Sequence, residues 1–372
     1  MIRLTIPSID EEDIAAVSEV LRSGYLVQGP KVKELEERFA AYVGSRHAVA
    51  LPNCTCALHL ALVALDVGAG DKVAVCTYSW PATANVIRIV GATPVFVDID
   101  RDTYNMDPAA LERALTHHRV KAVLPVHTFG NAADIERIVA IADRHGAAVV
   151  EDAACALGTE QGGRRAGSFG RIGCFSLHPR KAITTGEGGV LTTDDDAIAR
   201  MVRMLRNHGQ DPDAATPTFM LPGYNLRMTE FQGAFGLTQF HKLERIIAAR
   251  RAGAAEYDRL LEGTDIGAPR ALPGTRHVYQ TYLALLPAAL GGAKRDRAIA
   301  EMRARGVEST FGTYHMPLIK YFREWGGYKE GDFPVTDEIA GRVIALPLYE
   351  GLGAGEQRQV IDTLKDVVAG LG

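Results

Sequence analysis

The 372-residue chain has little of what marks several classes of protein. It contains five cysteines, an odd number, and none of them has zinc-knuckle spacing, so the sequence predicts neither a disulfide framework nor a metal site. The formal net charge is −4 and the basic residues are scattered, which argues against a nucleic-acid-binding surface. No apolar run reaches the length of a signal peptide or a membrane span, and we find no internal repeats. We therefore expect a cytoplasmic globular protein with no metal, membrane or nucleic-acid partner.

The length indicates more than one hydrophobic core, because single cores stop growing near 250–300 residues. We expect a large domain over residues 1–250, which begins with a helical arm over residues 1–45, and a small α+β domain over residues 251–372. The arm has two amphipathic helical stretches, from Ser8 to Gly24 and from about Val32 to Val43. Such an arm cannot bury its apolar face alone, so it must pack on the main domain or on a partner chain.

Short apolar stretches alternate with helical patterns after residue 47. Helices are expected to begin near residues 55, 81, 107 and 132. Buried strands are expected over residues 48–51, 72–76, 94–97, 122–125 and 147–151. Apolar strands that alternate with helices predict an α/β fold with a mostly parallel sheet and helices on both of its faces.

One lysine, Lys181, lies between a short apolar strand (residues 172–177) and a glycine-rich turn (residues 186–189). An isolated lysine is usually a solvated surface cation. A partly desolvated lysine can instead form a Schiff base with a carbonyl group. Asp152 ends a buried strand upstream, where open α/β sheets present reactive groups. Together the two residues fit a pyridoxal phosphate (PLP) site, where lysine binds the aldehyde and aspartate keeps the ring nitrogen protonated.

The turn over residues 52–59 leads into a helix and has two interpretations. Thr55 either caps that helix, or contributes to a phosphate seat at its N-terminus, where free N–H groups and the positive dipole end gather. A P-loop is excluded elsewhere, because the turn over residues 186–189 lacks the Gly-Lys-Ser/Thr signature.

Several spaced motifs resemble the DegT/DnrJ/EryC1/StrS family of PLP-dependent sugar aminotransferases, which have fold type I. The resemblance begins at residue 23 and covers nearly the whole chain. The matching segments are Glu151-Asp-Ala-Ala-Cys-Ala-Leu-Gly158, Cys174-Phe-Ser-Leu-His-Pro-Arg-Lys181, Thr184-Thr-Gly-Glu-Gly-Gly189, Leu205-Arg-Asn-His-Gly209, Gly223-Tyr-Asn-Leu-Arg-Met-Thr229 and Ser23-Gly-Tyr-Leu-Val-Gln-Gly-Pro30.

The resemblance implies roles for further residues at the cofactor. Thr55 and the backbone of Cys56 would hold its phosphate, with Ser176 as a second phosphate ligand. Trp80, in preference to Tyr78, would stack on the pyridine ring. Asn225 would reach the cofactor of the partner subunit, so the resemblance also implies a homodimer with shared active sites.

Other positions depart from the family or match it less closely. Cys54 stands where the family has Gly, and Cys155, near the cofactor's 3′ oxygen, stands where the family has Gln or His. The resemblance places Tyr314 and His315 on the substrate side. His178 either faces the sugar or packs locally, and His127, beyond another strand, is expected to be structural.

The sequence therefore predicts an aminotransferase that moves an amino group from an amino acid, expected to be L-glutamate, to a keto sugar, expected to be nucleotide-linked. Three rival functions stay open. A sugar dehydratase of the same family would have His in place of Lys181. A free cyclitol could replace the nucleotide sugar, and a non-enzymatic PLP-binding regulator would need a separate binding module, for which no helix-turn-helix pattern is evident.

Overall fold

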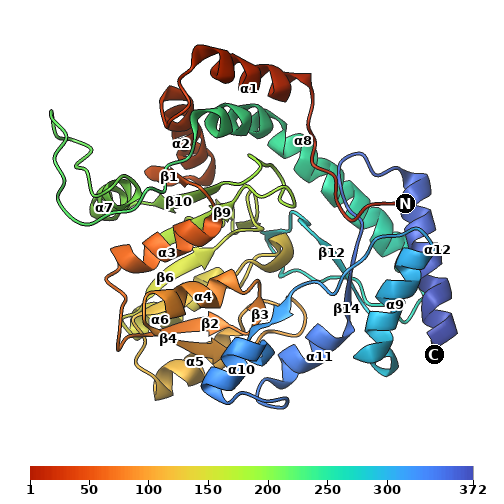
Figure 1. The fold of residues 1–372 in the computed structure, drawn as a ribbon. Helices are drawn as coiled ribbons and strands as arrows, with labels where there is room; N and C mark the ends of the chain where they lie inside the picture. Colours follow the sequence, from red (N-terminus) through yellow and green to blue (C-terminus); the bar gives the residue numbers. More distant parts are fainter. Residues whose placement is uncertain (372) are drawn as a thin grey trace.

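The computed structural model describes residues 1–371 and contains a large twisted sheet wrapped by helices (Figure 1). The helices span Glu11–Ser23 (α1), Pro30–Val43 (α2), Cys54–Ala64 (α3), Ala82–Ile89 (α4), Pro108–His117 (α5), Ile135–Arg144 (α6), Asp196–Arg206 (α7), Glu230–Leu261 (α8), Ala293–Ala304 (α9), Lys320–Gly326 (α10), Pro334–Arg342 (α11) and Ala354–Leu371 (α12). The main strands span His47–Leu51 (β1), Lys72–Cys76 (β2), Thr93–Val97 (β4), Ala122–Leu124 (β5), Ala148–Asp152 (β6), Ile172–Ser176 (β9) and Gly189–Thr193 (β10).

The 7-stranded sheet has the order β1-β10-β9-β6-β5-β2-β4. Strands β9, β6, β5, β2 and β4 pair in parallel, whereas β10 runs antiparallel to both of its neighbours. The predicted α/β fold with a mostly parallel sheet is confirmed. The predicted strands agree with the observed ones to within about one residue at each end.

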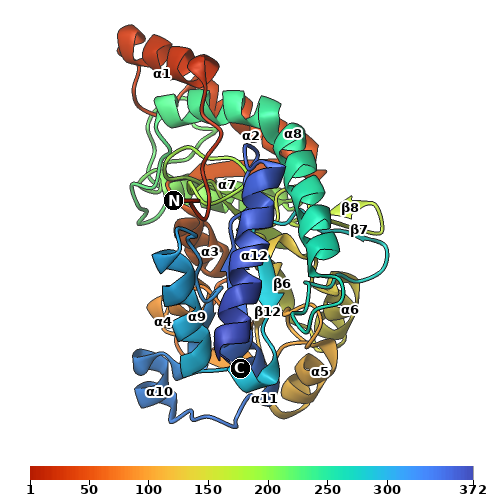
Figure 2. The ribbon, with the colours of Figure 1, turned by 90° about the vertical axis from the view of Figure 1, so that its right-hand side faces the viewer.

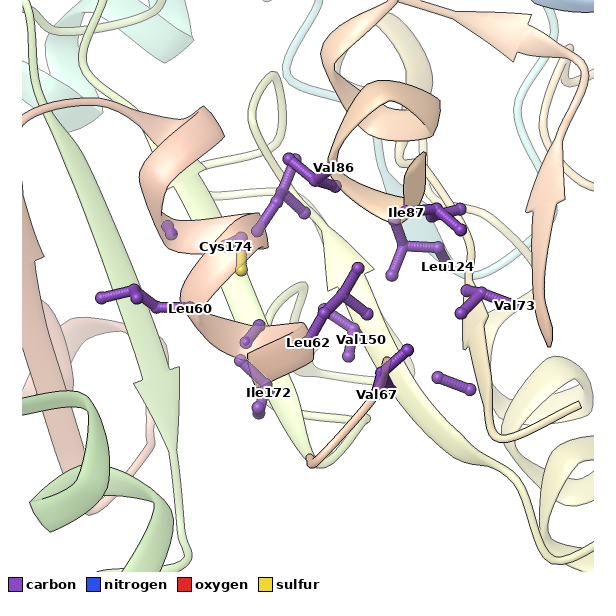
Figure 3. Packing of buried hydrophobic residues seen from close by; sticks show 14 of the residues in the cluster. Leu60, Leu62, Val67, Val73, Val86, Ile87, Leu124, Val150, Ile172 and Cys174 are labelled. Atoms are coloured by element: carbon purple, nitrogen blue, oxygen red, sulfur yellow. The ribbon is translucent and has the colours of Figure 1, made fainter. Parts of the chain in front are cut away.

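Alternating side chains of each strand enter different cores, because successive residues of a strand point to opposite faces. In β2, Val73 and Val75 join a core with α3, α4 and α7, part of which is drawn in Figure 3. Ala74 and Cys76 join a second core with α5 and α6 on the other face. In β1, Ala48 and Ala50 contact α2 and α8 in a third core on that second face. The helices therefore cover both faces, as the sequence predicts.

The remaining strands are short and connect distant parts of the chain. They span Tyr78–Ser79 (β3), Glu160–Gln161 (β7), Arg164–Arg165 (β8), Thr275–Arg276 (β11), Tyr282–Leu285 (β12), Tyr314–His315 (β13) and Val343–Leu346 (β14). Strand β12 pairs with β14, and this pair packs with α9, α12 and the end of α8 around a separate core (Figure 2). The domain division at residue 250 stays a prediction, and that residue lies within α8. No helix among residues 1–371 is both long and apolar enough to cross a membrane.

The N-terminal arm packs on α8, which runs just below α1 in Figure 1. The carboxylate of Glu230, at the start of α8, accepts hydrogen bonds from the backbone N–H groups of Gly29 (2.7 Å), Lys31 (2.6 Å) and Val32 (3.3 Å). These groups lie at the N-terminus of α2, where N–H groups lack intrahelical acceptors and a negative charge is favoured. The side chain of one helix therefore caps the other.

Removing this cap should loosen the arm. We expect Glu230→Ala to lower the free energy of unfolding by about 2–3 kcal/mol, because one buried and two partly buried N–H groups lose a charged acceptor. The matched control is Glu37→Ala, which removes an exposed carboxylate from α2 and should change stability by less than about 0.5 kcal/mol. Urea denaturation of both variants measures the difference. Equal stability of the two variants would mean that Glu230 does not dock the arm.

Candidate active site

Lys181 and Asp152 come together because β6 and β9 are adjacent parallel strands. Asp152 is the last residue of β6 and lies opposite Cys174 of β9 in the register. Lys181 follows β9 by five residues, in the loop that returns to β10. Asp152 therefore lies at the carboxyl end of its strand and Lys181 just beyond the end of the neighbouring strand, where open α/β sheets bind ligands.

The carboxylate of Asp152 is buried, with 4% of the residue exposed. It accepts hydrogen bonds from the Thr83 hydroxyl (2.8 Å) and from the backbone N–H of Ala154 (3.1 Å), and Thr83 in turn contacts Ser79 Oγ at 2.9 Å. Within residues 1–371 it forms no ion pair. Burial raises the pKa of Asp152 above its ordinary value, and the two hydrogen bonds oppose this only in part. An anion in this position favours a cationic partner.

Lys181 is half-buried, and its Nζ donates a hydrogen bond to Cys155 Sγ at 3.1 Å. Burial disfavours the ammonium form, but the contact with Cys155 and the nearby Cys54 and Asp152 outweigh burial, so the pKa of Lys181 lies above its ordinary value. The backbone N–H of Lys181 donates to the carbonyl of His178 (2.8 Å), which tightens the loop.

Glu151 precedes Asp152 and points to the opposite side of the strand. Its carboxylate is fully buried and accepts N–H groups from Gly167 (2.7 Å), Phe169 (2.7 Å) and Gly170 (2.6 Å). It also accepts from Nε2 of His127 (2.9 Å), because Nδ1 of that ring accepts the backbone N–H of Ala133 (3.1 Å). His127 is therefore structural, as expected from the sequence.

The N-terminus of α3 packs against the start of β10, the strand that follows the loop carrying Lys181. Its N-cap is Asn53, whose side chain accepts the N–H of Cys56 at 2.9 Å. The sequence interpretation of Thr55 as the cap is wrong, because Thr55 lies inside the first turn of the helix, with its side chain exposed. A Cβ on Gly189 of β10 would lie 2.3 Å from the carbonyl carbon of Asn53, so only glycine permits this close approach.

The residues expected around the cofactor ring and the substrate lie on a small ribbon. Strand β13 pairs with β3, which sets Tyr314 opposite Ser79 and beside Trp80. The rings of Trp80 and Tyr314 meet edge to face at 5.4 Å, and Trp80 is 60% exposed, whereas Tyr78 is fully buried. His315 Nε2 lies 3.0 Å from the Asp337 carboxylate, outside hydrogen-bond geometry, and its side chain is nearly buried.

The remaining predicted site residues, Ser176, His178 and Asn225, differ in their hydrogen bonds and exposure. Ser176 ends β9, and its hydroxyl oxygen accepts the N–H of His178 at 3.3 Å. The Nδ1 atom of His178 accepts the N–H of Arg180 at 3.2 Å, and burial lowers the pKa of His178. Asn225 is exposed, and its side chain forms no hydrogen bond within the described part of the chain. Its proposed role therefore depends on a second subunit.

These residues fit PLP by their chemistry. A buried carboxylate without a cation suits the ring nitrogen, and the amine of Lys181 suits the aldehyde. The first N–H groups of α3, at Cys54 and Thr55, have no intrahelical acceptor and suit a phosphate. No group of three or more His, Cys, Asp or Glu side chains among residues 1–371 is arranged to hold a metal ion.

The fold and the site define an enzyme of the PLP-dependent transferase class with fold type I. Residues 7–365 match the DegT/DnrJ/EryC1/StrS aminotransferase family, and the chain belongs to that family. The chain is 38% identical over 379 residues to the spore coat polysaccharide biosynthesis protein SpsC of Bacillus subtilis, covering 98% of this chain and 97% of SpsC.

Solved structures agree with this assignment. The putative sugar aminotransferase Spr1654 of Streptococcus pneumoniae, in its PMP form, superposes with a TM-score of 0.95 at 29% identity, and the match covers 100% of both chains. PseC of Helicobacter pylori, an aminotransferase involved in the biosynthesis of pseudoaminic acid, superposes with a TM-score of 0.94 at 25% identity and 99% coverage of both chains. DesV of S. venezuelae is 34% identical with a TM-score of 0.88, covering 96% of this chain and 94% of DesV.

Sequence reasoning missed the groups that hold the reactive residues in place. Thr83, which binds Asp152, and the contacts of Glu151 join segments far apart in the chain. Strand alternation gave one available signal, because an acid that precedes Asp152 in a buried strand must face the other side and needs donors there.

The buried carboxylate of Asp152 should destabilise the cofactor-free fold as the pH rises. A carboxyl group whose pKa is raised on folding binds its proton more tightly in the folded state. Its effect is favourable at low pH, and stability is lost as the pH rises from the unfolded value near ~4 through the folded value. We compare the free energy of unfolding of Asp152→Asn with that of wild type. On going from pH 4 to pH 7, this difference should change by about 1 kcal/mol in favour of the variant.

Urea denaturation of cofactor-free protein between pH 4 and pH 7 measures this change. Asp362→Asn, on the exposed face of α12, is the control and should track wild type at every pH. If the free energies of unfolding of Asp152→Asn and wild type differ by the same amount at every pH, the buried charge does not destabilise the fold as expected.

Proposed function

We propose that this enzyme uses PLP, held by Lys181, to transfer the amino group of L-glutamate to a nucleotide-linked keto sugar. The observation that carries the proposal is the placement of Lys181 and Asp152 at the carboxyl ends of adjacent strands, in a chain that belongs to an aminotransferase family. The amine and the buried acid are the two groups that PLP chemistry requires from a protein.

Each residue has a proposed part in holding the cofactor. Lys181 would bind the aldehyde, Asp152 the ring nitrogen, and Trp80 one ring face. The phosphate would lie at the N-terminus of α3 and near Ser176, with Thr55 and the backbone of Cys56 among its ligands. In the structure the Cys56 N–H is bonded to Asn53, so phosphate binding there would share or replace that bond. Cys155 is adjacent to Lys181.

The side chains would then handle protons during the reaction. Bound PLP supplies an aldehyde that captures amino groups and a ring that accepts electrons from the carbon being deprotonated. With PLP bound, the Nζ of Lys181 would be placed to take a proton from the donor's Cα and to deliver a proton to the acceptor carbon. Asp152 would keep the ring nitrogen protonated, and the hydrogen bond from Thr83 would hold the carboxylate in place for that role.

The relatives support a sugar acceptor. Spr1654 is described as a putative sugar aminotransferase, and PseC and SpsC take part in making pseudoaminic acid and spore coat polysaccharide. A nucleotide-linked sugar is the acceptor that we expect, and glutamate is the amino donor that we expect. Tyr314, His315 and His178 are the proposed substrate-side residues. A free cyclitol acceptor is the second candidate.

A dehydratase and a non-enzymatic regulator both have less support than an aminotransferase. A dehydratase of this family lacks the lysine, and Lys181 is present here. A regulator without enzymatic activity would need a separate binding module, whereas the family match runs from residue 7 to residue 365. We also propose that the enzyme works in the cytoplasm, which accords with the free state of Cys54, Cys56, Cys76, Cys155 and Cys174.

A two-part experiment tests the function. Borohydride reduction of the PLP-loaded protein should fix the cofactor on Lys181, identified by peptide mass. Incubation with a panel of nucleotide-linked keto sugars and free keto-cyclitols, with glutamate or glutamine as donor, should then give one aminated product by mass. Label on another lysine would overturn the cofactor assignment, and amination of cyclitols alone would overturn the proposed acceptor.

We propose that the working enzyme is a homodimer with shared sites. The segment after α7 projects from the rest of the chain (Figure 1). Apolar side chains in the arm and in this segment are exposed, among them Tyr25, Val27, Phe219 and Met220, which supports a partner surface. Asn225 lies close to the base of that segment, where its backbone forms an isolated β-bridge with Asn207. Its side chain is exposed and could therefore reach a second subunit. Two-fold symmetry would then place Asn225 of each chain at its partner's cofactor.

A mixed dimer tests this arrangement. Lys181→Ala and Asn225→Ala homodimers should each have little or no activity. In a dimer of one chain of each, one site carries both changes and the other carries neither, so activity should return toward half of the wild-type level. If no activity returns, Asn225 serves its own chain's cofactor, and full activity of Asn225→Ala alone would remove it from the site.

A further inference from the structure

Lys181 has an unusual neighbour in Cys155. The Sγ atom lies 3.1 Å from Nζ and accepts its hydrogen bond, which is the one bond that the structure gives the amine within residues 1–371. Cys155 lies in the turn after β6, three residues beyond Asp152, and is half-buried rather than enclosed in a core. The sulfur is thus placed at the reacting nitrogen itself.

The position of this turn is fixed by close packing. Gly130 has φ +86°, and a Cβ there would lie 3.0 Å from the carbonyl oxygen of Cys155 and 2.6 Å from Cγ2 of Val278. Only glycine combines that backbone conformation with such a close approach. The backbone N–H of Ala156 also donates to the carbonyl of Ala153 at 2.9 Å. Cys155 therefore has little freedom to move away from Lys181.

The other charged and titratable groups that face Lys181 are less suited to exchange a proton with it. Asp152, from β6, is engaged by Thr83 and Ala154. Cys54, from α3, is buried, and burial raises the pKa of its thiol well above the ordinary value. His178, from the same loop, has its pKa lowered by burial, and the charge of Lys181 adds to that shift. The sulfur of Cys155 is the group in direct contact.

We propose that Cys155 is the proton partner of Lys181. In the free enzyme the pair is a thiolate and an ammonium, whose attraction holds Nζ at the place where the cofactor aldehyde arrives. One proton then passes from Nζ to Sγ, which leaves a thiol and a neutral amine able to attack. The transfer requires no oxidant or other reactant, and the reverse transfer restores the ion pair when Lys181 is released.

This inference rests on the proposed role of Lys181 in binding PLP, and the raised pKa of Lys181 accords with it, because Cys155 is among its causes. A thiol beside a lysine is favoured in its thiolate form. A merely structural role for Cys155 would depend on its size and hydrogen bond, whereas a proton partner must also carry charge. Two substitutions of Cys155 separate these roles. Cys155→Ser keeps the size of the side chain without a charge, and Cys155→Asp keeps a negative charge.

The first experiment follows capture of added PLP by cofactor-free protein across pH 6–10, with borohydride reduction and peptide mass to confirm Lys181. We expect Cys155→Ala and Cys155→Ser to shift the capture midpoint to lower pH by about one unit, since an opposite charge nearby moves a pKa by about 1–3 units. Cys155→Asp should keep the wild-type midpoint, and so should Cys174→Ala, which removes a thiol from the core behind β9. Unchanged midpoints in both Cys155→Ala and Cys155→Ser would overturn the inference.

A second measurement needs no cofactor and no change at Cys155. At pH 7, iodoacetamide should alkylate Cys155 of the cofactor-free wild type at least about tenfold faster than in Lys181→Met, because the lysine favours the thiolate. Cys56, half-buried and without a lysine contact in the described residues, is the internal reference in each digest. Equal rates at Cys155 would overturn the pairing. Failure of wild type to capture PLP at Lys181 would instead overturn the proposed function and leave this measurement intact.

Discussion

The buried carboxylate of Glu151 is the contact on which the geometry of the site depends. It joins the end of β6 to the backbone of residues 167–170, immediately before β9, and to the ring of His127 after β5. A buried charge is costly unless it is well hydrogen-bonded, and here every donor is either a backbone amide or a ring held by one. Because β9 leads to Lys181, this anchor sets how the lysine lies relative to Asp152.

The two neighbouring acids on β6 have different surroundings and different proposed roles. Glu151 and Asp152 point to opposite sides, so they meet different surroundings although they share a backbone. Glu151 is saturated by N–H donors and is available for nothing else. Asp152 accepts hydrogen bonds from two neutral donors and, within the described chain, pairs with no cation. Its pKa is raised because these two bonds offset only part of the effect of burial. The unsatisfied acid is the one that a cationic ring nitrogen would complete.

Much of this arrangement could be predicted from the sequence because it depends on local patterns. Apolar strands between helices predicted the α/β sheet, and the acid at the end of β6 and the lysine after β9 predicted the reactive pair. The sequence could not show that β10 runs antiparallel between β1 and β9, because strand direction depends on how distant segments meet. Helix α8 continues to Leu261, past the predicted domain division at residue 250, and its C-terminal part packs on α12.

Side-chain partners were the least predictable part of the site. Asn53 caps α3 where Thr55 also had the right chemistry, and the choice depends on where the helix begins. The pairing of Cys155 with Lys181 joins two loops whose distance is set by β6, β9 and Gly130. None of these separations is encoded by spacing along the chain.

The site also separates fixed chemistry from adaptable recognition. Lys181 and Asp152 follow central strands whose ends are tied by buried hydrogen bonds, so their geometry is insensitive to surface changes. Trp80 and Tyr314 stand instead on the β3–β13 ribbon, which joins the sheet edge to the C-terminal part of the chain, and Asn225 is exposed. If the ribbon faces the substrate as proposed, substitutions on it would reshape that space without moving the amine or the acid. Under the proposed function, such a division would keep the residues that handle protons fixed while the ribbon varies.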